Sequence, residues 1–151
     1  IEADYFMIAE PAASAQSKKG YSIVGNVQTL YGGENGFPQA ALVAKNSLLV
    51  EHEDWVKSFV ERVDGASVWL TETDGATLVA TVNAHMDDRT SETSLKAPLL
   101  TQTALAGCGI RFTYAAADFE EVNAFLTKLL LVNDKATAMP SENFYWTYFE
   151  P

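Results

Sequence analysis

Short apolar runs that alternate with amphipathic stretches are the feature that most constrains the fold of this chain. Residues 5–9 and 39–44 are almost entirely apolar, which is typical of strands buried on both faces of a parallel sheet. Glu10 and Pro11 end the first run, and proline suits the first turn of a helix, so a helix is predicted up to Gly20. Strands that alternate with helices predict an α/β fold, with the later helices packed on one side.

Two long stretches carry clear helical patterns. Apolar residues recur at spacings of three and four over 55–70, with Trp55 and Phe59 on the expected apolar stripe. The same pattern covers 119–129, and Asp118 stands ahead of it at capping-box spacing from a glutamate. Further expected helices are a short one after Asn46 and two over 76–86 and 95–106. A strand or extended segment is expected over 21–30, a half-buried strand over 110–114 and a loop over 87–92. An aromatic tail over 144–149 is expected to pack against the fold.

Composition excludes several classes of partner. The 151 residues include 20 acidic and 10 basic ones, and the net charge of -10 opposes binding to phosphate backbones or anionic membranes. We therefore expect no nucleic acid partner. No apolar run approaches the ~18 residues that a membrane-spanning helix needs. The single cysteine, Cys108, has no disulfide partner and is interpreted as a small buried residue.

The sequence lacks the motifs of the common catalytic sites. It has no phosphate-binding loop, no Gly-x-Ser-x-Gly, no His-Glu-x-x-His and no paired cysteines. His52 stands among acidic neighbours and is interpreted as a solvated residue rather than a metal ligand. His85 with Asp87 and Asp88 resembles a metal triad, but these residues run into a polar loop. We therefore expect no catalytic residue, no metal and no cofactor.

Two positions suit contact with a small ligand. Glu10 follows the end of a predicted strand, where open α/β sheets place their ligand crevice. Its carboxylate is equally suited to accept hydrogen bonds from a ligand or from nearby backbone. Gly36 allows close approach of the backbone to another group, and Phe37 presents a flat apolar face beside the amide of Gln39. By composition alone, a plain turn is the better interpretation of this second position.

Three segments in succession resemble solute-binding proteins of the nitrate, sulfonate, taurine and thiamine-precursor group. Residues 3–14 are similar to the D-x-x-x-x-x-E-P segment of that group. Residues 36–44 are similar to its return crossing between lobes, and the Trp-Val-x-x-Phe element follows at 55–59. A weaker likeness runs over 110–145. Together the segments extend over nearly the whole chain.

The resemblance implies part of a two-lobed, type II periplasmic-binding-protein-like fold, whose lobes are three-layer α/β/α structures. Residues 1–30 would end the second lobe and begin a crossing segment, and residues 31–151 would supply the C-terminal portion of the first lobe, without the N-terminal half. The implied function is the substrate-binding component of an ABC importer, which closes over a small polar or nitrogenous solute and docks on a membrane permease. The implied location is extracytoplasmic, in the periplasm or as a lipoprotein on a Gram-positive cell surface.

The resemblance also implies a set of ligand contacts without any catalytic residue. The candidate ligand-binding residues are Glu10, Pro11, Gly36, Phe37, Pro38 and Gln39. The charge of Glu10 would repel a sulfonate or nitrate, so a neutral or cationic nitrogenous ligand such as an aminopyrimidine is expected. Without the other half, exposed edges and patches predict dimerisation, exchange of elements or pairing with a separate N-terminal portion. The alternatives are a ligand-sensing regulatory module of the same fold and, less favoured, an enzyme of thiamine-pyrimidine synthesis.

Overall fold

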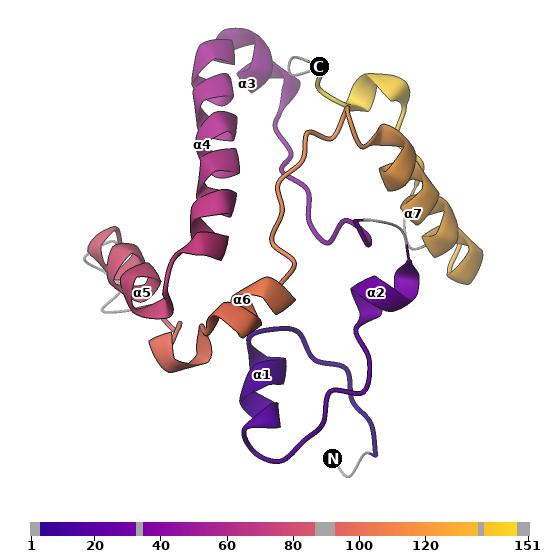
Figure 1. The fold of residues 1–151 in the computed structure, drawn as a ribbon. Coiled ribbons are helices and arrows are strands. Elements are labelled where there is room, and N and C mark those ends of the chain that lie inside the picture. The colour runs from indigo at the N-terminus through magenta and orange to yellow at the C-terminus, as the bar shows by residue number, and fades with distance from the viewer. Residues whose placement is uncertain (1–3, 33–34, 87–92, 136–137, 148–151) are drawn as a thin grey trace. The chain divides into compact units, whose positions relative to one another are not determined.

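The chain is a set of helices joined by irregular segments (Figure 1). The computed structural model describes residues 4–32, 35–86, 93–135 and 138–147. The α-helices are α1 (Ala12–Ser17), α2 (Val27–Tyr31), α3 (Asn46–Glu51), α4 (Glu53–Glu72), α5 (Gly75–Ala84), α6 (Gln102–Gly107) and α7 (Phe119–Val132). Two 3₁₀ turns are η1 (Ala97–Leu99) and η2 (Glu142–Phe144).

Two compact units make up the chain, and each combines two separate stretches of sequence. The first unit is Ile1–Val24 with Ser58–Phe112, and the second is Gly25–Lys57 with Thr113–Pro151. The division into lobes that the resemblance implies, at residue 30, stays a prediction.

The predicted α/β class is wrong, because the described residues form helices and no strand or sheet. The apolar runs 5–9 and 39–44 have no regular structure and lie exposed, with Met7 85% and Val43 71% accessible. A strand is stable only when neighbouring strands take its backbone hydrogen bonds. Neither run has such a neighbour in the described chain, so the three-layer α/β/α lobe expected from the sequence does not form.

Most of the predicted helices are confirmed, with two local corrections. Pro98 divides the helix expected over 95–106, since it lies in the first turn of η1 and Thr101 then starts α6 by accepting a hydrogen bond from the Ala104 N–H. Asp118 occupies the N-cap position of α7, but its side chain makes no capping hydrogen bond. The expected loop over 87–92 lies outside the described residues.

Helix α4 departs from the expected apolar stripe in its first turns, although Leu70 of that stripe packs against the core of the first unit. Val56 and Val60 are buried, whereas Trp55 and Phe59 of the predicted stripe are 60% and 40% exposed. The helix begins with acidic residues in its first turn, where the positive end of the helix dipole stabilises their negative charge. Lys57 forms an ion pair with Glu53 at 3.0 Å one turn later.

The first unit has a small core on α5. Leu78 is 2% exposed and packs with Leu100 and Leu105. Gly75 at the start of α5 lies against backbone carbonyls, since a Cβ there would be 2.6 Å from the Leu100 oxygen. Any side chain at this position would force η1 and α5 apart.

The second unit packs its aromatic tail against α7. Tyr145 is buried, its hydroxyl donates to Asn123 Oδ1 at 3.2 Å, and its ring meets Phe119 edge to face at 5.0 Å. The predicted packing role of the tail is confirmed for Tyr145, whereas Tyr148 and Phe149 lie outside the described residues.

Candidate functional site

Glu10 stands at the start of α1, where its carboxylate binds the first turn of the helix. Oε2 accepts a hydrogen bond from the Ser14 N–H at 3.0 Å, and Oε1 accepts one from Ser14 Oγ at 3.1 Å. Pro11 occupies the N-cap position and makes no side-chain cap itself. The carboxylate of Glu10 therefore satisfies a helix terminus that would otherwise lack a partner.

Helix α6 meets this carboxylate at a glycine. A Cβ on Gly107 would lie 3.1 Å from Glu10 Cγ and 3.2 Å from Oε1, so the missing side chain permits the close approach. Burial, and secondly the negative charge of Glu10, raise the pKa of the Cys108 thiol. We call Glu10, Ser14, Gly107 and Cys108 the Glu10 cluster.

The chemistry of the Glu10 cluster is that of a hydrogen-bond acceptor. An ionised carboxylate offers about four lone-pair sites, and Ser14 uses two of them in this structure. The raised pKa keeps the Cys108 thiol protonated at neutral pH, whereas a nucleophilic cysteine needs a lowered pKa. The cluster is suited to receive N–H donors and poorly suited to nucleophilic attack.

Ser14, Gly107 and Cys108 are members of this cluster that the sequence did not connect to Glu10. Gly107 and Cys108 are far from Glu10 along the chain, and α6 brings them to the carboxylate. The available signal was the run of small residues at 106–109, which lets the backbone come close to another group.

The second predicted position, around Phe37, is held by a side-chain clamp. Gln28 in α2 accepts a hydrogen bond from the Phe37 N–H at 2.7 Å and donates one to the Phe37 carbonyl at 3.1 Å. Gly36 has φ +70°, and a Cβ there would overlap the Gln28 side chain. Glycine is therefore required at this turn both for its conformation and for space.

The face of Phe37 is covered by other aromatic rings. It stacks on Phe125 of α7 with a centroid separation of 5.2 Å and an angle of 8°, and Tyr31 meets both rings edge to face. Lys128 Nζ lies 4.0 Å from the centroid of the Tyr31 ring. Phe37 thus contributes to packing in the second unit.

The six candidate ligand-binding residues fall into two groups. Glu10 and Pro11 are half-buried in the first unit, and Gly36, Phe37, Pro38 and Gln39 belong to the second unit. Pro38 and Gln39 are exposed beside the clamped Phe37. Their shared role in binding one ligand stays a prediction.

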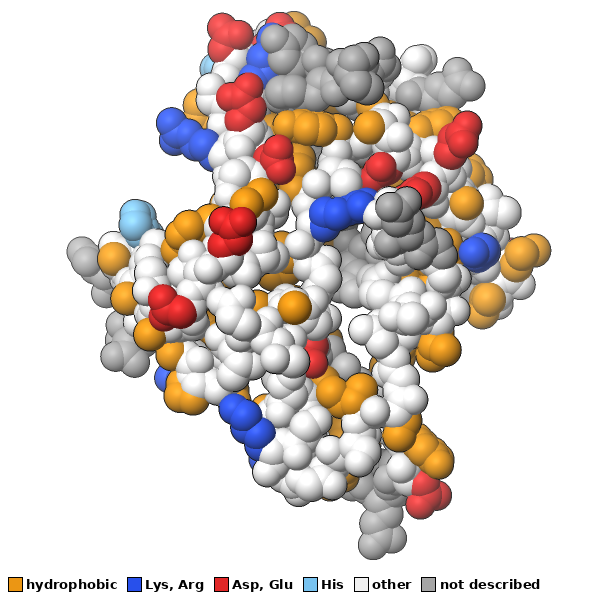
Figure 2. Space-filling view, in the orientation of Figure 1, with side chains coloured by type: hydrophobic (Ala, Val, Ile, Leu, Met, Phe, Trp, Pro, Cys, Tyr) orange, Lys and Arg blue, Asp and Glu red, His pale blue; other side chains and the backbone are white. Residues whose placement is uncertain are grey.

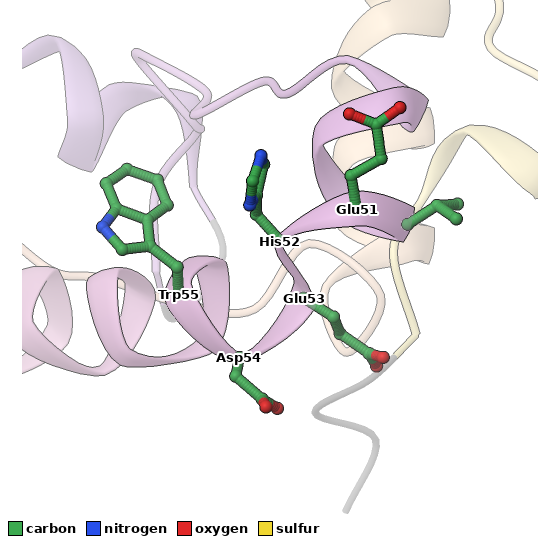
Figure 3. Close-up of a pocket in the computed structure, with 6 residues that line it drawn as sticks. Glu51, His52, Glu53, Asp54 and Trp55 are labelled. Atoms are coloured by element: carbon green, nitrogen blue, oxygen red, sulfur yellow. The ribbon is translucent and has the colours of Figure 1, made fainter.

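A surface hollow of about 380 Å³ lies at the junction of α3 and α4 (Figure 3). Figure 3 shows Glu51 and His52 on one side of the chain and Glu53 and Asp54 on the other. The lining residues are the consecutive residues 50–55, and the two downstream acids already contact Lys57. The hollow is a local feature of the helix junction and gives no basis for a ligand site.

The remaining candidates are dispersed over the surface. In Figure 2, acidic side chains are scattered over the visible face. His52 is exposed, as predicted, and so is His85, whose Nδ1 lies 2.8 Å from the Thr81 carbonyl. Asp87 and Asp88 of the imagined metal triad lie outside the described residues. Among the residues that are described, no group of three or more His, Cys, Asp or Glu is placed to hold a metal ion.

Comparison of the chain with protein-family models, curated proteins and solved structures finds no match. Within the described ranges, every helix is too short or too polar to cross a membrane.

Proposed function

We propose that this chain acts in the extracytoplasmic capture of a small polar, nitrogenous solute, as a substrate-binding component of an ABC importer. The observation that carries this proposal is the half-buried carboxylate of Glu10, which is oriented by Ser14 and keeps acceptor capacity. A positioned acceptor of this kind fixes the orientation of a ligand that carries N–H groups. The three segments that resemble those of solute-binding proteins, in the same succession along the chain, support the transport role, including docking on a membrane permease.

Charge favours a neutral or cationic solute. The chain carries a net charge of -10, and the Glu10 carboxylate would stand next to any ligand bound at α1. An anion there would meet like charge at short range, which is costly away from bulk water. An aminopyrimidine, which donates N–H groups and is neutral or cationic, matches the acceptor better than an alkylsulfonate.

A binding role also fits the state of the thiol. Cys108 supplies the thiol of the Glu10 cluster, and its raised pKa opposes thiolate formation. In this proposal Cys108 is a packing neighbour of the ligand acceptor, and the chain has no catalytic residue.

Thermal shift and calorimetric titration with 4-aminopyrimidine and with ethanesulfonate test the proposal. We expect stabilisation by the pyrimidine alone, and about tenfold or greater weakening in Glu10→Gln, because the charged acceptor becomes a neutral amide with one acceptor oxygen fewer. Glu61→Gln, which changes an exposed acid in α4, is the matched control and should bind like the wild type. Binding of ethanesulfonate in place of the pyrimidine, or equal binding by both variants, would reject the proposal.

A further inference from the structure

The segment between Pro38 and α3 exposes a row of unused backbone groups. Within the described chain, none of the N–H groups of residues 39–45 donates a hydrogen bond, and no carbonyl of residues 38–44 accepts one. Residues 39–44 are exposed at every position, so the odd-numbered and the even-numbered side chains both face solvent. Leu42 and Val43 are 58% and 71% accessible. Backbone groups in this state are a template for pairing with another chain.

The segment has defined ends that are equidistant from one residue. Pro38 has no N–H to donate to a strand ladder, and from Asn46 onwards the backbone belongs to helix α3. Lys45 already has extended angles, with φ -71° and ψ 141°. The stretch available for strand pairing is therefore 39–45, and its midpoint is Leu42.

We propose that residues 39–45 pair in antiparallel orientation with the same residues of a second copy of this chain, centred on Leu42. In a two-fold antiparallel pair the axis passes between two directly opposed residues, so the central residue faces itself. Leu42 then packs on Leu42 of the second copy. A centre at Ala41 would bring Pro38 into the ladder, and a centre at Val43 would draw α3 into it.

Charge and size across the pair favour a second copy as the occupant. In this register Ala41 opposes Val43 and Ala40 opposes Ala44, so no two large branched side chains compete for space except at the axis. Gln39 opposes Lys45, whose ammonium can donate to the amide oxygen, and the two Lys45 residues stay at opposite ends. Residues 39–44 carry no charge, so a strongly charged partner strand would find no counter-charge.

Sedimentation equilibrium of the whole chain tests the association. We expect a concentration-dependent dimer of twice the 16.5 kDa chain mass. Leu42→Pro fixes φ at about −65°, far from the value of about −140° in an antiparallel strand, and removes the leucine that would pack on its own copy. It should therefore shift the protein to monomer, with at least a tenfold higher dissociation constant. Val24→Pro, at an exposed non-helical apolar residue of the other unit, is the matched control and should leave the dimer intact. A wild-type monomer, or equal dissociation by both proline variants, would overturn the proposal.

Cysteine scanning tests the register independently of stability. In a Cys108→Ala background, single cysteines are placed at Ala41, Leu42 and Val43 and oxidised under mild conditions. Directly opposed residues have Cα atoms about 4.5–5.5 Å apart, within the range of a disulfide. Leu42→Cys should therefore cross-link to itself much faster than either neighbour. Equal cross-linking at all three positions would indicate a parallel or non-specific contact and would contradict the proposed pairing.

Discussion

At the residue scale, Glu10 has the most informative surroundings in the chain. Its carboxylate accepts two hydrogen bonds from Ser14 in the first turn of α1 and is contacted by Gly107 from α6. The raised pKa of the Cys108 thiol reports the same proximity, through burial and the charge of Glu10. The absence of a side chain at residue 107 is what lets these groups come together.

Alanine substitutions at two helical glycines should have opposite effects on stability. Gly65 in α4 has no atom within 4 Å of an added Cβ, so Gly65→Ala should raise the free energy of unfolding by about 0.5–1 kcal/mol through helix propensity. Gly107→Ala should lower it, because the Cβ would press on Glu10 at 3.1 Å. Urea denaturation measures both changes.

The Glu10→Ala background gives the control for this comparison. Once the carboxylate is removed, Gly107→Ala should lose its penalty, since the three atoms nearest to the new methyl group all belong to the Glu10 side chain. If Gly107→Ala stabilises the wild-type background as much as Gly65→Ala does, the close approach of α6 to Glu10 is wrong.

At the element scale, α5 has the strongest cap in the described chain. Asp74 accepts hydrogen bonds from the Ala76 and Thr77 N–H groups at 3.0 Å and from Thr77 Oγ1 at 2.7 Å. The side-chain bond from Thr77, followed by the backbone bonds, lowers the pKa of the Asp74 carboxyl. The cap is coupled to the core because α5 carries Leu78.

Asp74→Ala should destabilise the protein in a pH-dependent way. A carboxyl whose folded pKa lies below its ordinary value of 3.8 stabilises the fold fully above that value, and the contribution is lost as the pH falls through the lower folded pKa. The stability difference between wild type and Asp74→Ala should therefore be larger at pH 7 than at pH 2. Denaturant unfolding across this range measures the difference, and Asp134→Ala is the control without such a cap. A constant difference would contradict the charged role of Asp74.

At the scale of the whole molecule, each of the two units contains a small packed set of side chains. Leu78, Leu100 and Leu105 form the core of the first unit, whereas Tyr145 packs on α7 in the second. Each set is small, so deletion of one buried side chain removes a large share of the packing in its own unit.

Leu78→Ala should weaken the first unit selectively. Truncation of a fully buried leucine costs about 2–5 kcal/mol, which is a large fraction of the stability of a small domain. Hydrogen exchange measured by mass spectrometry should show faster exchange in α5 and α6, with α7 unchanged. Leu131→Ala, at a residue 83% exposed in α7, should leave both units unaltered. Equal loss of protection in the two units would mean that they unfold as one body.

The sequence singled out part of each candidate site but not its neighbours. Glu10, Gly36 and Phe37 stood out by residue type and position, and the structure places each among close contacts. Gln28, which clamps Phe37, and Cys108, beside Glu10, lay too far along the chain for local patterns to connect them. Their proximity depends on how α2 and α6 pack, which no spacing rule reports.

The sequence by itself determined the long helices α4 and α7, the acidic charge and the ends of several helices. These features depend on local interactions, because a helix satisfies its backbone through residues four positions away and its caps lie within one turn. Only the tertiary structure decided that the apolar runs 5–9 and 39–44 stay unpaired and exposed. Strand pairing needs a backbone partner from elsewhere, and an apolar pattern alone cannot say whether that partner is present.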